Sequence, residues 1–294
     1  MELSYARRCR RRVARWIPVV FITLGACWGY YAYVFGLCIA TVTSHTERVI
    51  YLVFFHPLFV MSLVSYWTTL CTRPVKPPKE FCLSEADKEL YKEQETQEDK
   101  QRVLREAARH LPISTIPEIR YCERCQLLKP DRCHHCSTCD VCVLKQDHHC
   151  LALNNCVGYS NYKSFLLLIM YSLLSCLFVS GTTLRFFILT WTDEPQVTER
   201  TSDIRVLFCL STAFSILLLM LFICHCCLLV RNRTTIEFRY GDASSGGDGR
   251  PLGFKNFQDV FGQEKRYWLL PVDTSQGDGY SRPSLPDDPE KYAE

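Results

Sequence analysis

The chain has 294 residues, a formal net charge of +3 and a hydrophobic content of 48%. The small net charge gives no general tendency to bind polyanions, and basic and acidic residues balance within the cysteine-rich stretch, so nucleic acid is not an expected partner. The apolar residues are gathered into blocks, which indicates membrane-spanning segments rather than one or two soluble domains.

Four apolar runs are long enough to cross a bilayer, which takes about 20 helical residues. An arginine-rich segment, residues 1–15, precedes the first run. A signal peptide would also begin with basic residues and an apolar run, but the length of this run and its aromatic end favour a retained helix. The segment 16–71 holds the first two predicted spans, at about 16–39 and 49–71, and the segment 165–230 holds the other two, at about 165–191 and 206–230.

Basic residues predict the orientation of these spans. The N-terminal arginines, residues 73–79 after the second span, and Arg231 with Arg233 after the fourth lie on one side. The positive-inside rule therefore makes both termini and the central loop, residues 72–164, cytosolic. A reducing cytosol favours metal thiolates over disulfides in that loop. The alternative is a lumenal loop linked by disulfides, which would place all three basic segments on the side that the positive-inside rule disfavours.

The polar segments predict less structure. After a proline-rich joint, one charged helix is expected from Ser84 to His110, because Ser84 and Asp87 form a capping-box pattern. A cysteine-rich domain follows at about residues 120–160. After the fourth span comes a C-terminal region, residues 231–272, and the Pro-, Gly- and acid-rich residues 273–294 predict a disordered tail.

The segment 121–157 contains eight of the 18 cysteines, arranged as a repeat. Two sets share the form C-x2-C-x9-H-x6-C and are shifted by 14 residues. Three thiolates and one imidazole form the closed ligand shell of a structural zinc ion. The predicted fold is therefore an all-α polytopic membrane protein, with four transmembrane helices and a cytosolic cysteine-rich domain that binds two structural Zn²⁺ ions. The two sets are Cys122, Cys125, His135 and Cys142, and Cys136, Cys139, His149 and Cys156.

The two ligand sets use six of these eight cysteines, and of the two left over, Cys150 stands where the repeat would place the first cysteine of a third pair. A second shift of 14 residues gives Cys150 and Leu153, so the third C-x2-C pair is broken. Cys150 follows His148, which the repeat does not use, and Asp147. A thiol close to a free histidine is typical of an activated nucleophile. The alternative is that Cys150 is a packing thiol or a stray ligand.

Only a few residues separate Cys150 from the third span, so we expect its sulfur to lie near the cytosolic face of the bilayer. A long-chain acyl-CoA presents its head to water and its chain to lipid at that depth. The expected chemistry is a two-step thioester exchange, in which Cys150 first takes the acyl group and a substrate cysteine then removes it. His148 would take the proton, and Asp147 would orient the imidazole.

The sequence Asp147-His148-His149-Cys150, within this cysteine-rich segment and between the second and third spans, resembles the DHHC-type zinc-finger protein S-acyltransferases. The resemblance covers most of the chain. It also includes the segments 129–132, 155–158 and 160–163, the Thr-Thr-x-Glu motif at 234–237, and Asn256 in an aromatic segment.

The resemblance implies that Asp147, His148 and Cys150 are catalytic and that palmitoyl-CoA is a co-substrate. It implies four helices that enclose the acyl chain above the zinc domain, and membrane-associated protein substrates with cytosolic cysteines. The compartment would be the Golgi or the plasma membrane, with the endoplasmic reticulum as a further possibility. It also implies that Thr234 or Thr235 contacts the Asp147 region, and that Glu237 and Asn256 support the structure.

One departure from the family pattern leaves an alternative function open. Family members usually have Pro-Trp after the nucleophile, whereas this chain has Leu151 and Ala152. An inactive zinc-stabilised membrane scaffold is therefore the second hypothesis. A transporter or channel is less favoured, because the spans lack paired charges. A positive cluster suits phosphate, so we expect the acyl-CoA head group to contact Lys129, Arg132 and His134. An equally weighted alternative is that these three residues are ordinary surface charges.

Overall fold

The computed structural model describes residues 10, 13–113, 118–191, 201–240, 253–277, 279 and 280. Within these residues, four helices are long and apolar enough to cross a membrane. Most of the N-terminal segment 1–15 and all of residues 281–294 lie outside the described residues. The spans predicted from the apolar runs are confirmed, and the protein is a multi-pass membrane protein. They are α2 (Ile17–Tyr31) continued by η1 (Ala32–Ile39), α3 (His45–Cys71), α6 (Tyr162–Leu189) and α7 (Thr201–Val230).

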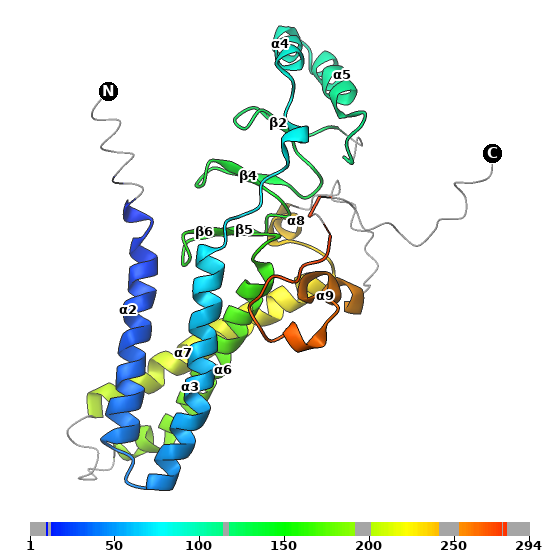
Figure 1. The fold of residues 1–294 in the computed structure, drawn as a ribbon. Coiled ribbons are helices and arrows are strands. Elements are labelled where there is room, and N and C mark those ends of the chain that lie inside the picture. Colours follow the sequence, from blue (N-terminus) through cyan, green and yellow to red (C-terminus); the bar gives the residue numbers. More distant parts are fainter. Residues whose placement is uncertain are drawn as a thin grey trace.

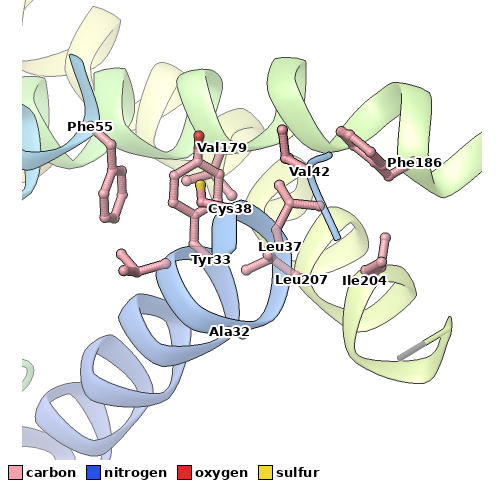
Figure 2. Close-up of a cluster of buried hydrophobic side chains, with 11 residues drawn as sticks. Ala32, Tyr33, Leu37, Cys38, Val42, Phe55, Val179, Phe186, Ile204 and Leu207 are labelled. Carbon is pink, nitrogen blue, oxygen red and sulfur yellow. The ribbon is translucent and has the colours of Figure 1, made fainter. Parts of the chain in front are cut away.

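The first span changes its winding where it meets the other helices. η1 is a π-helix, and it presents Tyr33, Leu37 and Cys38 to a buried cluster that also contains side chains of α3, α6 and α7 (Figure 2). Tyr33 and Thr182 share a hydrogen bond of 2.9 Å between their hydroxyl groups. This cluster closes the end of the helices that lies far from the cysteine-rich domain (Figure 1).

Hydroxyl pairs join the long helices along their length. Ser62 of α3 and Ser175 of α6 are 3.3 Å apart, and Ser180 of α6 and Thr212 of α7 are 2.7 Å apart. Small side chains allow close helix approach in a membrane, and hydrogen bonds between helices add to the packing. α6 therefore stands between α3 and α7 and contacts both.

The cysteine-rich domain lies between α3 and α6 in the sequence. After η2 (Lys79–Phe81) come α4 (Glu85–Glu93) and α5 (Gln97–Ala108), so the prediction of one helix from Ser84 to His110 is wrong. The chain turns at residues 94–96 because Thr96 caps a second helix, accepting from the backbone of Asp99 just as Ser84 accepts from Asp87.

Three antiparallel hairpins complete this domain, within the described residues. Each strand has two or three residues, and most of the structured chain is helical, so the predicted fold class is confirmed. In Figure 1 the hairpins lie between the long helices and the α4–α5 pair. The hairpins are β1 (Tyr121–Cys122) with β2 (Leu127–Leu128), β3 (His134–Cys136) with β4 (Val141–Val143), and β5 (His148–Cys150) with β6 (Asn155–Val157).

The C-terminal region folds back onto both parts of the molecule. It contains α8 (Thr235–Tyr240), α9 (Gly253–Phe261) and η4 (Lys265–Tyr267). The disorder predicted from residue 273 does not hold for its first residues. Thr274 accepts a hydrogen bond from the buried ammonium of Lys163 and donates one to the carbonyl of Phe261. A buried ammonium group needs such partners, which explains why this segment is fixed.

Candidate active site and metal centres

The two Cys/His groups expected from the repeat are brought together. In each group the four possible ligand atoms lie within 4.8 Å of one another. The three sulfurs of the first group are 3.4–3.9 Å from Nδ1 of His135, and those of the second are 3.4–3.6 Å from Nδ1 of His149. A tetrahedral zinc site with Zn–S of about 2.3 Å and Zn–N of about 2.0 Å requires an S···N separation near 3.5 Å. The donor sets therefore suit two zinc ions.

Turn geometry explains how a C-x2-C pair converges. Gln126 and Asp140, each four residues after the first cysteine of a pair, have positive φ angles of 54° and 56°. Their backbone N–H groups donate to the carbonyls of Cys122 and Cys136 over 2.7 Å. The chain thus curls around the metal position, and the histidine and last cysteine arrive on the following hairpin.

Cys150 begins a third, related turn, in which the N–H of Leu153 donates to the carbonyl of Cys150 over 3.3 Å. Asn154, four residues later, has a φ of 44°. Leu153 occupies the place of the second thiol and is buried among apolar side chains. Among the described residues, Cys150 belongs to neither metal group. The repeat therefore explains why Cys150 begins a turn and why residue 153 offers no second thiol.

Cys150 lies beside His148 and Asp147, as the sequence predicts. His148 Nδ1 is 2.7 Å from Oδ2 of Asp147. The side chain of His148 also interacts with the thiol of Cys150, and each group shifts the pKa of the other. His148 and Cys150 are at alternate positions of β5, so both side chains project from the same face. The thiol, the imidazole and the carboxylate are connected in that order, which is the arrangement of a catalytic triad.

The Thr-Thr-x-Glu motif fixes Asp147 from α8. Thr235 donates to Asp147 twice, from its backbone N–H over 2.9 Å and from its hydroxyl over 2.7 Å. Thr234 and Glu237 form a capping box, with each side chain bonded to the other residue's backbone N–H. The first threonine and the glutamate therefore start α8, and the second threonine holds the carboxylate.

Electrostatics favour a charged pair at this site. Burial alone would raise the pKa of the Cys150 thiol, but the hydrogen bond and charge of His148 lower it below its ordinary value. Burial would lower the pKa of His148, yet its bonds to Asp147 and Cys150 raise that pKa to about 9. Burial would raise the pKa of Asp147, whereas His148 and the N–H of Thr235 hold it below its ordinary value. A thiolate beside an imidazolium is the expected resting form.

The apolar neighbours of Cys150 come from all four spans. The cluster beside the thiol contains Val19, Tyr66, Phe165 and Phe222. The ring of Phe165 also packs edge-on against His148, with centroids 5.1 Å apart. The nucleophile therefore faces the end of the helices, where an acyl chain can leave water.

The residues that replace Pro-Trp occupy two different environments. Leu151 is 68% exposed, and Ala152 accepts a hydrogen bond from the hydroxyl of Tyr66 over 3.2 Å. The carbonyl of Ala152 thus ties the turn to α3. The connection from Asp147 through His148 to Cys150 is complete without the usual pair.

The residues expected at the acyl-CoA head group have separate surroundings. Arg132 makes a bidentate ion pair with Glu237, at 2.6 and 3.0 Å, and bonds Asn232, so its charge is already compensated. His134 lines a cavity of about 460 Å³, which His148 and Arg239 also line. Lys129 lies just after β2 and is partly buried.

Asn256, expected to support the structure, donates to the carbonyl of Val230 and so links α9 to α7.

Two residues were not assigned to the site from the sequence, where His225 was interpreted as a packed or interfacial residue and Asn155 only as part of the segment 155–158. His225 of α7 is buried 6.0 Å from the ring of His148 and bonds the hydroxyl of Tyr162 over 3.2 Å. Asn155 of β6 bonds the end of α3. A histidine within an apolar run was a visible signal for His225, but the partner of Asn155 depends on the tertiary fold.

These features define a membrane protein with two zinc-type centres and a separate cysteine of the triad kind. The family model of the DHHC palmitoyltransferases matches residues 115–241. Palmitoyltransferase ZDHHC20-A of Danio rerio is 51% identical over 291 residues, which cover 97% of this chain and 82% of that protein. Palmitoyltransferase ZDHHC20 of Bos taurus is 54% identical over 290 residues, which cover 94% and 79%. Palmitoyltransferase ZDHHC2 of Homo sapiens is 50% identical over 300 residues, which cover 98% and 81%.

The chain belongs to the DHHC palmitoyltransferase family. The resemblance seen in the sequence is thereby confirmed, together with the prediction of a protein S-acyltransferase that uses acyl-CoA. The inactive scaffold is not favoured, because the relatives are palmitoyltransferases over most of this chain's length.

Proposed function

We propose that Cys150 carries the acyl group between acyl-CoA and the protein substrate. The observation that supports this most directly is the position of its sulfur, outside both metal groups and on the same face of β5 as His148, which Asp147 holds. The eight metal-site residues hold two structural zinc ions, which rigidify three hairpins too small to form a core of their own. The zinc ions fix the loop and take no part in bond making.

The proposed reaction has two steps. The Cys150 thiolate attacks the thioester carbonyl of acyl-CoA, the bond from that carbon to the CoA sulfur breaks, and His148 gives its proton to the departing thiolate. A substrate cysteine then loses its proton to His148 and attacks the acyl-enzyme, which frees Cys150. Asp147 stabilises the imidazolium in the resting form and holds the ring in position, with Thr235 fixing the carboxylate. Glu237 and Asn256 support this arrangement from α8 and α9.

The head group of acyl-CoA is proposed to lie along the cavity of His134, His148 and Arg239. Phosphate groups favour such a basic setting. Lys129 and Arg132 are proposed as further contacts, with a smaller contribution from Arg132 because Glu237 already neutralises its charge. The long acyl chain is proposed to extend among the apolar side chains beside Cys150.

The orientation follows from the basic residues beside the spans, so we place both termini and the zinc domain in the cytosol. The substrates are then membrane-associated proteins with cytosolic cysteines. The Golgi or the plasma membrane is the proposed compartment, with the endoplasmic reticulum as the next candidate.

The function is tested by labelling the purified protein with a fluorescent fatty-acyl-CoA. The label should attach to Cys150, hydroxylamine should release it, and the Cys150→Ser variant should remain unlabelled while retaining its zinc. Cys82→Ser is the matched control, because Cys82 is an exposed cysteine outside both metal groups, and this variant should label normally. Equal labelling of the Cys150→Ser protein would refute the proposal.

A further inference from the structure

Asn155 joins the hairpin of the nucleophile to the end of a membrane-spanning helix. It is the residue paired with Cys150 across the β5–β6 hairpin. Its buried carboxamide nitrogen lies 3.0, 3.2 and 2.8 Å from the carbonyl oxygens of Thr69, Leu70 and Thr72 and donates to them. The last carbonyls of a helix have no partner within the helix. Asn155 therefore supplies the missing donors at the end of α3.

The same side chain is also fixed on the hairpin. Its Oδ1 accepts from the backbone N–H of Cys156 over 2.9 Å, and Cys156 belongs to the second metal group. One carboxamide thus connects the rigid metal-bound hairpin to the rigid helix. Other links at this junction are single bonds, such as the 3.1 Å bond from Ser160 to the carbonyl of Arg73. Tyr66 also bonds the carbonyl of Ala152, and Asn161 that of Thr69, by one hydrogen bond each. Asn155, with three contacts, is therefore the side chain with the most polar contacts holding Cys150 at its height above α3.

That height has a consequence for a bound acyl chain. The chain would begin at Cys150, beside the cluster of Tyr66 and Phe165. The opposite end of the helices is closed by the cluster of Tyr33 and Leu37 (Figure 2). The available length between these two ends depends on where the hairpin stands on α3. With carbon–carbon bonds of about 1.5 Å, a displacement of about 1.3 Å along an extended chain corresponds to one methylene group.

We propose that Asn155 is a specificity-determining positioning residue, which sets the preferred acyl chain length by fixing the β5–β6 hairpin on the end of α3. The inference rests on the proposed function, because it requires Cys150 to carry the acyl group. It assigns the choice of chain length partly to a polar contact outside the apolar lining. The side-chain partners of Asn155 are carbonyls at the end of α3 and the N–H of Cys156, so it acts through the position of the hairpin.

The test compares acyl-enzyme formation in single turnovers with saturated acyl-CoA of 14, 16, 18 and 20 carbons, a series that lengthens the buried chain by two methylene groups at each step. The proteins are the full-length chain, Asn155→Ala and Asn155→Gln, each checked for two zinc ions by elemental analysis. Ser160→Ala is the matched control, because it removes a bond between the same two segments without touching the paired strands.

The native protein should show one preferred acyl chain length. On either side of it the rate of acyl-enzyme formation should fall by about fourfold per methylene group, since burying one methylene group changes an equilibrium or rate by about that factor. Asn155→Ala should flatten this profile, and Asn155→Gln, which keeps the amide on a longer side chain, should move the optimum. A uniform loss of rate at all lengths, or an equal change in Ser160→Ala, would overturn the inference. If Asn155→Ala fails to retain zinc, the Gln variant decides alone. An unlabelled native Cys150 would instead refute the proposed function.

Discussion

Replacing Thr235 by valine removes one hydroxyl group from Asp147 and keeps the shape of the side chain. In the structure the hydroxyl of Thr235 and Nδ1 of His148 both lie 2.7 Å from Oδ2 of Asp147. Asp147 is 1% exposed, so water cannot readily replace the lost donor. A hydrogen bond to a charged group contributes about 1.5–3 kcal/mol. If the transition state loses this amount, acyl-enzyme formation slows by about tenfold to hundredfold.

The assay is a single-turnover gel measurement with fluorescent acyl-CoA, and elemental analysis confirms that the variant keeps its zinc. Thr235→Ser is the control, because serine retains the hydroxyl and should recover most of the rate. A valine variant that acylates at the native rate would show that Asp147 does not depend on the hydroxyl of Thr235. A serine variant as slow as the valine variant would assign the effect to packing.

Three other predictions concern the same region. Arg132→Met leaves the carboxylate of Glu237 buried without its partner and should destabilise the protein by about 3–5 kcal/mol, measured by thermal unfolding. Adding Glu237→Gln should restore much of the lost stability, and an unchanged melting temperature of the Arg132→Met variant would contradict the pairing. Asp147→Asn should slow alkylation of Cys150 by iodoacetamide at neutral pH, because a His148 imidazolium that is less stabilised lowers the thiol pKa less. The rate is followed by mass spectrometry, and an unchanged rate would show that Asp147 has no such role. Cys142→Ala should reduce the zinc content below one ion per chain, because the ligands Cys136 and Cys139 lie between His135 and Cys142; independent sites would retain one ion.

The sequence predicted the features that depend on composition and spacing. Apolar runs locate the four spans because a bilayer demands about 20 apolar residues in succession. The 14-residue repeat separates Cys150 from the metal ligands because each ligand set must contain four members. The same reasoning could not find the break between α4 and α5, since the capping pattern at Thr96 lies within a continuous charged segment.

The family resemblance implied the long-range contact of Thr235 with Asp147, but most other long-range polar contacts were beyond sequence reasoning. Arg132 was a candidate phosphate contact, with ordinary surface charge as an equal alternative, and its ion pair with Glu237, 105 residues away, was not foreseen. The amide of Asn155 reaches α3 across 83–86 residues. Lys163 fixes a segment that composition alone assigned to a disordered tail. In each case the residue type was visible, but its partner depended on how the long helices bring distant segments together.

The bonds from α8 to Asp147 and Arg132 also impose an order on biosynthesis. Residues 234–237 emerge from the ribosome about 90 residues after Asp147, and only once α6 and α7 have been translated. It follows that a nascent chain which stops before the fourth span holds its cysteine without the threonine that orients the carboxylate. Such a truncated chain would therefore acylate Cys150 more slowly than the full-length protein, because the carboxylate of Asp147 would lack both hydrogen bonds from Thr235.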